Sequence, residues 1–183
     1  IFRKAIEEAN DVIRKRASED EKLEGMGTTV VVASCMGRFL QVANVGDSRL
    51  YYIGKDIQQI TRDHSLVEDM VRMGLLEKEE ARTHYKKNVI TKAIGVAEDK
   101  TATPDIFEIE IDNGDKLLLC SDGLTNMVID YDINKIIRKS ESIEDAVRTL
   151  INTANENGGK DNISAILISA EYTENQDSLL SEQ

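Results

Sequence analysis

The sequence has few cysteines and no long apolar run. It holds two cysteines among 183 residues, with no Cys-x-x-Cys pair and no cluster of cysteine with histidine. This pattern argues against a disulfide framework and against a zinc site. We expect Cys35 and Cys120, which lie in apolar runs, to be buried free thiols in a reducing compartment such as the cytoplasm. No run approaches the roughly 20 apolar residues of a membrane helix, so no membrane partner is expected.

The sequence is also short of positive charge. Lys and Arg number 23 against 34 Asp and Glu, which gives a net charge of −11 at pH 7. A nucleic-acid partner is not expected, because such binding depends on clustered Lys and Arg that neutralise phosphates. The 40% hydrophobic and 31% charged composition is typical of a folded globular protein, and the length suits one domain with a real core.

The pattern of apolar residues predicts a single α+β domain, with strands and helices grouped in runs, and a polar tail at 171–183. The turn residues Asn113-Gly114 predict a hairpin between the strands on either side of them. Helices are predicted over 1–23, 65–74, 78–82, 130–139 and 143–156, and strands over 28–35, 38–45, 49–54, 56–61, 105–111, 115–120 and 163–169.

Three aspartates share one kind of position. Asp47, Asp122 and Asp161 each lie close to glycine at the end or the start of an apolar strand. Taken singly, such an aspartate is most often a turn residue that bonds its own backbone. If the three meet at one rim, they repel each other unless a cation lies between them. Mg²⁺ and Mn²⁺ suit such oxygen ligands, so the pattern hints at metal-assisted hydrolysis of a phosphate ester.

Six motifs occur in order along the chain and strengthen this interpretation. Together the motifs resemble those of the metal-dependent Ser/Thr protein phosphatases, the PPM or type 2C family, from about Ile1 to Ala170. The helical insert at about 62–95 resembles the flap of bacterial members. The motifs are GMGTT (25–29), NVGDSRLY (44–51), TRDHS (61–65), NVITKAIG (88–95), LLLCSDGL (117–124) and GGKDNIS (158–164).

The resemblance implies a fold, an activity and a cofactor. The fold is an α-β-β-α sandwich of two antiparallel sheets flanked by helices. The activity is hydrolysis of phosphoserine and phosphothreonine in proteins by a metal-activated water, without a phosphoenzyme. Two catalytic Mn²⁺ or Mg²⁺ ions and a possible third are implied. The partners are phosphorylated proteins and a cognate Ser/Thr kinase, and the protein is expected to be a monomer in the cytoplasm.

The resemblance also assigns residues. It places Asp122 and Asp161 on the second catalytic metal, and it makes Asp47 share a third, weaker metal with Asp122. The turns that aim these carboxylates are shaped by Gly46, Gly123 and Asn162.

Residues of the insert have weaker assignments. His64 and His84 are candidates for a substrate contact, a structural role or a general acid. Asn88 is a candidate oxygen ligand near the third metal. Arg49, two residues after Asp47, is expected to form a buried salt bridge.

The chain departs from the family pattern at its beginning. It lacks the motif Arg-x-x-Asn-(Glu/Gln)-Asp, which supplies a phosphate-binding Arg and an acidic ligand, and it lacks Asp-Gly-x-Gly-Gly, whose Asp bridges both metals. Because Ile1 stands inside an amphipathic pattern, we expect residues 1–170 to be a partial domain without its N-terminal segment and strands. Without the bridging carboxylate and the Arg clamp, we expect the parent protein to be a phosphatase and this chain to be much impaired.

Two alternative functions stay open. The first is a non-catalytic, phosphatase-like interaction domain, which retention of all three aspartates argues against. Failure of the full-length form to bind Mn²⁺ would favour it. The second is a phosphatase of the type that controls a sigma-factor antagonist, which the helical insert argues against because those relatives usually lack or shorten it.

Overall fold

The computed structural model describes residues 1–96 and 102–171. Of the predicted polar tail at 171–183, all but the first residue lies outside these ranges. The chain divides into two compact units that are interleaved in sequence, and each has its own hydrophobic core. Unit 1 comprises Ile1–Val32, Val42–Arg49 and Ile60–Phe107, and unit 2 comprises Ala33–Gln41, Leu50–Gln59 and the residues from Glu108 on.

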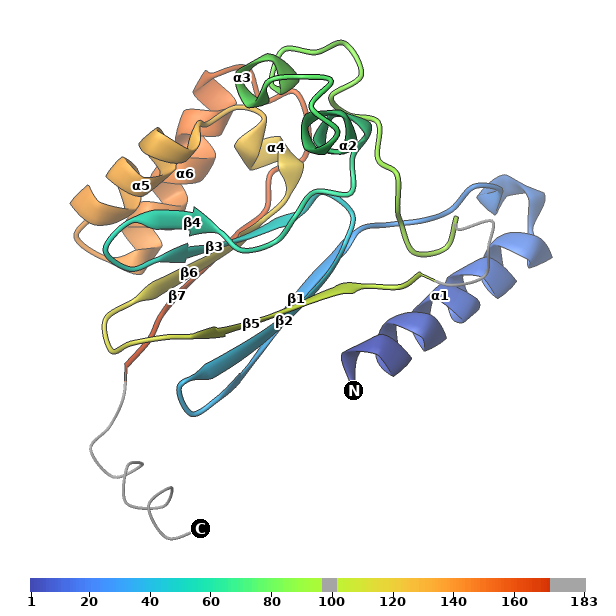
Figure 1. Cartoon of the computed structure of the whole chain (residues 1–183), viewed down its shortest axis with the longest axis horizontal. Coiled ribbons are helices and arrows are strands. Elements are labelled where there is room, and N and C mark those ends of the chain that lie inside the picture. The colour runs from blue at the N-terminus through green and yellow to red at the C-terminus, as the bar shows by residue number, and fades with distance from the viewer. Residues whose placement is uncertain (97–101, 172–183) are drawn as a thin grey trace, which may run out of the picture. The chain divides into compact units, whose positions relative to one another are not determined.

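The strands form two sheets (Figure 1). Strand β3 pairs with β4, and β6 pairs with β7, in antiparallel fashion. Two antiparallel sheets together with helices confirm the predicted α+β class. The first sheet has the order β1 (Val30–Met36), β2 (Phe39–Val45), β5 (Asp105–Glu110), and the second has the order β4 (Ile57–Gln59), β3 (Arg49–Ile53), β6 (Lys116–Cys120), β7 (Ala165–Ser169).

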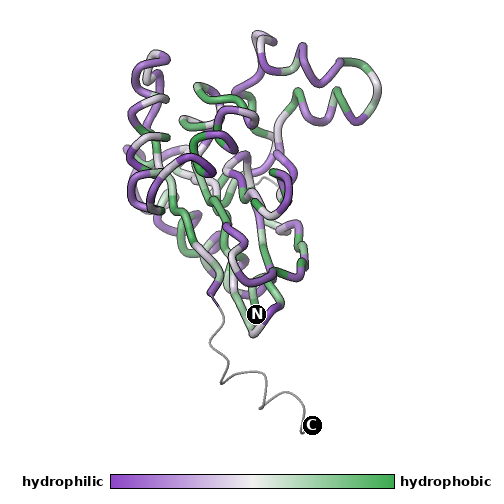
Figure 2. The backbone as a smooth tube through the Cα atoms, turned by 90° about the vertical axis from the view of Figure 1, so that its left-hand side faces the viewer, coloured by the Kyte–Doolittle hydropathy of each residue, from purple (hydrophilic) through white to green (hydrophobic). Residues whose placement is uncertain are grey.

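The core of unit 1 forms where helix α1 (Phe2–Glu19) packs against the first sheet. Buried Ile6 of the helix joins Ala43 and Val45 of β2 in one cluster. Apolar residues recur along α1 every three or four positions, so one face of the helix is buried. Figure 2 shows this alternation of hydrophobic and hydrophilic stretches along the helices. Asn10 is fully buried as well, and its Oδ1 accepts a hydrogen bond of 2.9 Å from the Gly95 N–H.

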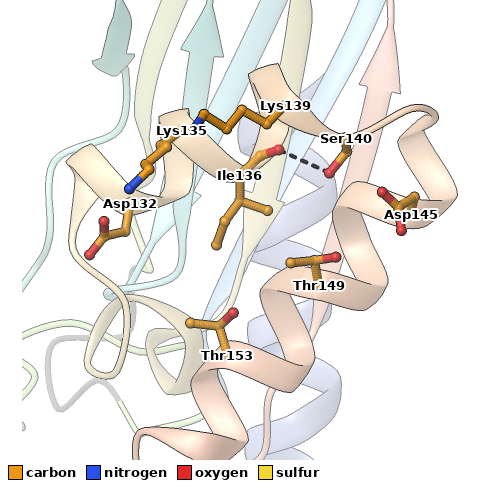
Figure 3. Close-up of a pocket in the computed structure, with 8 residues that line it drawn as sticks. All are labelled: Asp132, Lys135, Ile136, Lys139, Ser140, Asp145, Thr149 and Thr153. Atoms are coloured by element: carbon orange, nitrogen blue, oxygen red, sulfur yellow. Dashed lines mark hydrogen bonds between the residues drawn. The ribbon is translucent and has the colours of Figure 1, made fainter.

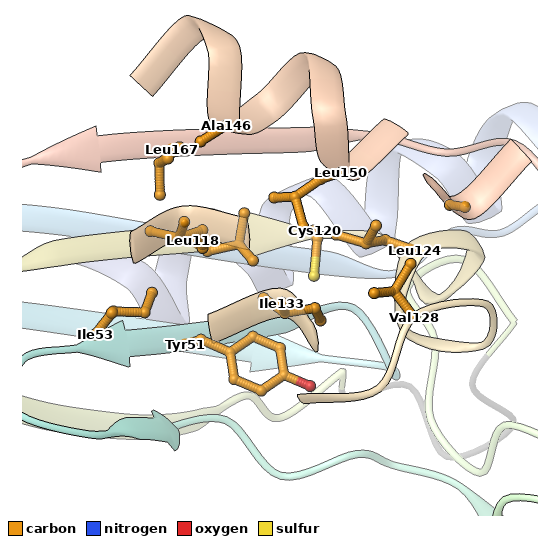
Figure 4. Packing of buried hydrophobic residues seen from close by; sticks show 12 residues of the cluster. Tyr51, Ile53, Leu118, Cys120, Leu124, Val128, Ile133, Ala146, Leu150 and Leu167 are labelled. Carbon is orange, nitrogen blue, oxygen red and sulfur yellow. The ribbon is translucent and has the colours of Figure 1, made fainter. Parts of the chain in front are cut away.

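The core of unit 2 lies between the second sheet and helices α5 (Asp130–Lys139) and α6 (Ile143–Glu156), as Figure 4 shows. Tyr51, Leu118, Ile133 and Leu150 are fully buried there, and each such side chain contributes about 1.5–3 kcal/mol by leaving water. The Ser142 hydroxyl accepts a hydrogen bond from the Asp145 N–H at 3.1 Å and so caps α6. This core supports the strand end and the short helix of the candidate site.

Four short helices complete the described structure, and none of the helices in residues 1–96 and 102–171 is both long enough and apolar enough to cross a bilayer. Helix α1 ends earlier than predicted, at Glu19, and a 3-10 turn η1 follows. The bounds of the short helices are Glu21–Leu23 for η1, Leu66–Arg72 for α2, Lys78–Ala81 for α3 and Asp122–Thr125 for α4.

The predicted hairpin around Asn113-Gly114 is wrong, because β5 and β6 belong to different sheets. At the end of β5, the Ile111 N–H donates to the Arg38 carbonyl at 2.9 Å and continues the first sheet. Three residues later, the Gly114 N–H donates to the Ala170 carbonyl at 2.7 Å and begins the pairing of β6 with β7. The turn itself forms, with Gly114 at φ +87°, but it directs the chain to a new partner strand.

Cys120 is buried as predicted, but Cys35 is exposed, and both thiols are free. Cys35 lies in the second half of β1, an edge strand of its sheet, where Met36 is exposed as well. Its thiol donates to the Gly37 carbonyl at 3.2 Å. The prediction failed because an apolar run is compatible with an edge strand that is only partly covered.

Candidate metal centre

Asp122 lies where β6 ends and α4 begins. Ser121 is the N-terminal cap of α4 and has an extended backbone, and Asp122 is the first helical residue. The Asp122 Oδ2 atom accepts a hydrogen bond from Asn126 Nδ2 at 3.0 Å. Leu124, in the same helix, is fully buried in the core of unit 2. The half-buried Asp122 carboxylate is therefore held by a packed element.

The turn that carries Asp161 lies directly against the turn that carries Asp122. The Ser121 N–H donates to the Ser164 carbonyl at 3.1 Å, and the Ser164 N–H donates to Ser121 Oγ at 3.0 Å. The Ser121 hydroxyl in turn donates to the Asn162 carbonyl at 3.2 Å. These three hydrogen bonds tie the residue before Asp122 to the residues after Asp161.

Gly123 permits this close approach of the two turns. A Cβ atom at Gly123 would lie 2.2 Å from the Asn162 carbonyl oxygen, which is a backbone atom that no rotamer can move away. Only glycine fits a position where another backbone comes this close. Gly123 thus has a steric reason to be glycine, whereas only the backbone of Asn162 takes part in the contact, so the predicted role of Asn162 stays a prediction.

Asp47 follows β2 in a tight turn of unit 1. The preceding Gly46 has φ +112°, and a Cβ there would lie 2.3 Å from Thr29 Cγ2. Both the backbone conformation and the lack of space therefore require glycine. The Thr29 hydroxyl also shares a hydrogen bond of 3.0 Å with the Ser48 hydroxyl. Contacts on both sides of Asp47 thus fix the turn against Thr29, the residue before β1.

The TRDHS segment holds the same turn from another side. The His64 N–H donates to the Gly46 carbonyl at 2.9 Å, and the Gly46 N–H donates to His64 Nδ1 at 3.0 Å. Asn44 Nδ2 donates to the carbonyls of Gly46 at 3.1 Å and of Arg62 at 3.0 Å. Both the N–H and the carbonyl of Gly46 are therefore hydrogen-bonded, and this fixes the backbone directly before Asp47.

Arg49 and Asp63 form a second link between these two segments. Arg49 Nε donates to Asp63 Oδ1 at 2.9 Å, and Arg49 Nη2 donates to Asp63 Oδ2 at 2.7 Å. The side chains are only 21% and 13% exposed, so water screens the pair weakly. This confirms the salt bridge predicted for Arg49 and names its partner. Paired N–H donors of a guanidinium on one carboxylate fix orientation as well as distance.

The ring of His64 is buried among charged groups. Its Nε2 lies 3.2 Å from Asp105 Oδ2, and Lys92 Nζ lies 3.5 Å from Asp105 Oδ1. Burial, and then the charge of Lys92, lower the pKa of His64 below its ordinary value. For Asp105, burial alone would raise the pKa of the carboxyl, but the His64 hydrogen bond and the charges of His64 and Lys92 hold it below its ordinary value. Asp105 is thus an anionic partner for His64.

The donor chemistry of the three aspartates fits a hard divalent cation. Mg²⁺ and Mn²⁺ prefer carboxylate oxygens, and Asp122 and Asp161 offer them from abutting turns. Asp47 belongs to the other unit, so its meeting with this pair stays a prediction. Within residues 1–96 and 102–171, no group of three or more His, Cys, Asp or Glu side chains is close enough to hold a metal ion. The ligand roles therefore also stay predictions.

The insert at 62–95 carries the remaining predicted residues. Its two ends meet at an antiparallel bridge between Ser65 and Ile90, beside which the Leu66 N–H donates to the Val89 carbonyl at 2.8 Å. The helices α2 and α3 lie between these ends.

His84 and Asn88 lie in the second half of the insert. The rings of His84 and Tyr85 are 4.7 Å apart, and His84 Nδ1 accepts a hydrogen bond from the Lys86 N–H at 3.2 Å. Asn88 is exposed. Neither residue is among those that hold the Asp47 turn, so their roles at substrate or metal stay predictions.

A groove of about 400 Å³ lies between α5 and α6 (Figure 3). Lys135 and Lys139 line it together with Asp132 and Asp145, so the positive and negative charges in the lining balance. None of the predicted site residues lines this groove. It is therefore separate from the candidate metal centre.

Sequence reasoning missed Asp63, Asp105 and Lys92 as partners of site residues. Asp63 stands in the TRDHS motif, so the signal available from the sequence was a carboxylate in a motif near an arginine that was expected to form a salt bridge. Asp105 begins a strand 41 residues after His64 and has no pattern that links the two. Lys92 has no local pattern that links it to Asp105, but its ammonium group pairs with that carboxylate.

Known proteins match most of this chain in sequence. The family model for protein phosphatase 2C matches residues 1–163. The serine/threonine phosphatase stp of Listeria monocytogenes is 40% identical over 174 residues, which cover 94% of this chain and 68% of that protein.

Solved structures agree with this match. The crystal structure of the serine/threonine phosphatase Stp1 from Staphylococcus aureus has a TM-score of 0.89 and 41% identity, and the match covers 93% of this chain and 67% of that one. The catalytic domain of the protein phosphatase PstP, solved with two manganese ions, has a TM-score of 0.83 and 30% identity, with 93% and 70% covered. The chain spans about two thirds of the length of these relatives.

Proposed function

Because the chain belongs to the protein phosphatase 2C family, we propose that it hydrolyses phosphoserine and phosphothreonine in proteins with Mn²⁺ or Mg²⁺ as cofactor. The observation that carries the proposal is the pair of abutting turns that present Asp122 and Asp161. Carboxylate oxygens, which both residues offer, are the ligands that Mn²⁺ and Mg²⁺ prefer. The manganese ions of the PstP structure support the choice of cofactor.

In this proposal the three aspartates serve two cation sites. Divalent cations bound here would supply a water of lowered pKa and would offset the charge of the phosphate. Asp122 and Asp161 bind one cation together, and the lack of a side chain at Gly123 keeps their turns in contact. Asp47 adds a carboxylate for a weaker ion, on a turn that Gly46 allows.

The substrates and partners follow from the same proposal. A phosphorylated protein is the substrate, and a cognate Ser/Thr kinase supplies the phosphate. The insert at 62–95 contacts the phosphoprotein, with His84 and Asn88 as the residues to test. The proposal also has the protein act as a monomer in the cytoplasm.

Mn²⁺ binding by isothermal calorimetry tests the metal centre. Asp122→Asn keeps the shape of the side chain and removes its charge, so we expect the affinity for Mn²⁺ to fall by more than about tenfold. Asp56→Asn is the matched control, because Asp56 is exposed and lies outside the site, and it should bind Mn²⁺ as the unchanged chain does. Equal affinities in all three proteins would contradict the proposed site.

Phosphate release from a phosphothreonine peptide tests the activity. We expect the full-length form to release phosphate in a reaction that requires Mn²⁺, stops when EDTA removes the metal and is lost in Asp122→Asn, and we expect this chain to release much less. If the chain binds Mn²⁺ through Asp122 but releases no phosphate, and its full-length form releases none either, the non-catalytic interaction domain becomes the better account. The two assays thus separate a failure of the metal site from a failure of the chemistry.

A further inference from the structure

His64 is buried behind the Asp47 turn, and every polar group of this residue has a partner. Its backbone N–H donates to the Gly46 carbonyl at 2.9 Å, and its backbone carbonyl accepts from the Thr91 N–H at 2.8 Å. The ring nitrogen Nδ1 lies 3.0 Å from the Gly46 nitrogen, and Nε2 lies 3.2 Å from Asp105 Oδ2. The side chain is 7% exposed. His64 therefore joins the base of the insert, the turn of β2 and the start of β5.

These partners determine the protonation of the ring. A backbone N–H can only donate, so the bond from Gly46 requires that Nδ1 carry no proton. A neutral imidazole then has its proton on Nε2, where Asp105 is the acceptor. Lys92 Nζ lies 3.5 Å from the other oxygen of Asp105, which keeps that carboxylate anionic and oriented. Lys92 Nζ also lies 3.4 Å from Nε2. An ammonium group only donates, so it makes no hydrogen bond to a protonated Nε2, and the bond from Gly46 to Nδ1 decides the tautomer.

We propose that His64 is a positioning residue for Asp47: its Nε2–H tautomer, held by Asp105, keeps the Gly46 backbone in the conformation from which Asp47 binds a cation. This inference rests on the proposed function, because it gives Asp47 a metal to bind. Gly46 is buried, so without the ring its N–H would have no acceptor at the residue that precedes Asp47. An apolar side chain of similar size would fill the space but could not accept that hydrogen bond.

Nitrogen NMR of the histidine rings tests the tautomer in the unaltered chain. The chain has only two histidines, so the spectrum of His64→Asn assigns the ring of His84 and, by difference, the ring of His64. We expect the His64 signals to show a protonated Nε2 and an unprotonated Nδ1 at neutral pH. A proton on Nδ1 of His64, or signals averaged between the two tautomers, would overturn the proposal.

Mn²⁺ affinity in variants tests the positioning. His64→Ala removes the acceptor, and we expect it to weaken the binding of Mn²⁺ at the Asp47 site by about tenfold, as loss of the groups that orient a ligand typically does. His64→Asn places an amide oxygen near the position of Nδ1, and we expect it to restore the affinity to within about threefold of the unchanged chain. Val67→Ala, a buried change in α2 of the same insert, removes no bond to Gly46 and serves as the control for lost stability.

The reference variant Asp47→Asn separates the two proposals. If Asp47→Asn weakens Mn²⁺ binding and His64→Ala does not, the positioning role is refuted while the metal centre stands. If His64→Asn or Val67→Ala weakens binding as much as His64→Ala does, a general loss of structure explains the effect and the positioning role is again refuted. If Asp47→Asn leaves Mn²⁺ binding unchanged, the metal role of Asp47 fails, and the inference fails with it.

Discussion

Replacing Gly123 with alanine tests whether the two aspartate turns must touch. A Cβ atom at this position would lie 2.2 Å from the Asn162 carbonyl oxygen and 3.0 Å from its carbonyl carbon. The turns would have to separate by about 1 Å before this contact reached an ordinary 3.4 Å. Because the atoms in contact belong to the backbone, the hydrogen bond from the Ser121 hydroxyl to the Asn162 carbonyl would stretch as well.

The expected cost follows from that overlap. Forcing one extra carbon into a packed site costs about 1–3 kcal/mol, and a clash with backbone places Gly123→Ala near the upper end. A loss of about 3 kcal/mol lowers the Tm of a chain of this size by about 6–12 °C, which circular dichroism measures. Mn²⁺ affinity should fall too, because Asp122 and Asp161 move apart.

Gly114→Ala is the control for this experiment. Gly114 has φ +87° and nothing within 4 Å of its missing Cβ, so alanine there meets only the cost of the backbone conformation, about 1–2 kcal/mol. We expect a small fall in Tm and unchanged Mn²⁺ affinity. Native Tm and native Mn²⁺ affinity in Gly123→Ala, or equal losses of both in the two variants, would refute the reasoning.

Three further outcomes are expected. Asp63→Asn removes the charged partner of the half-buried Arg49 and should lower the free energy of unfolding in urea by about 1.5–3 kcal/mol, whereas an unchanged value would show that the pair adds nothing. The hydrogen bond from Tyr52 to Asp115 raises the pKa of Tyr52 to about 12 from 10.0, so its contribution to stability is complete below pH 10 and is lost as the pH rises to about 12. Ultraviolet titration of the chain and of Asp115→Asn should differ by one tyrosine, which ionises late in the chain and in the ordinary range in the variant; identical titration curves for the two proteins would contradict this. A thiol reagent should label Cys35 alone in the folded chain and both cysteines after denaturation, and equal labelling before denaturation would contradict the burial of the second thiol.

The helices of unit 2 were predictable because their signals are local. Residues 130–139 and 143–156 have apolar positions at helical spacing, and the structure has α5 and α6 with these bounds. The cap from Ser142 to Asp145 could also be read from neighbouring residues. The six ordered motifs likewise pointed to the turns of the candidate site.

Contacts between distant segments were not predictable in the same way. An Asn-Gly turn has the same chemistry whether the chain folds back or crosses to another sheet, so Asn113-Gly114 could not reveal that β6 pairs with β7. Nothing local links His64 to Asp105, because their contact depends on where β5 begins in the folded chain. The exposure of Cys35 depends on which strand occupies the edge of a sheet, and the composition of β1 does not contain that information.

The bridge between Ser65 and Ile90 brings the two ends of the insert together, so the residues between them form a closed loop. Because the chain enters and leaves this loop at one place, the loop can change in length or sequence without changing the pairing of the strands in the two sheets. Doubling the length of such a loop costs only about 0.6 kcal/mol in closure entropy. This loop, whose length is cheap to change, is fastened through His64 to a turn where Gly46 leaves no room for a side chain.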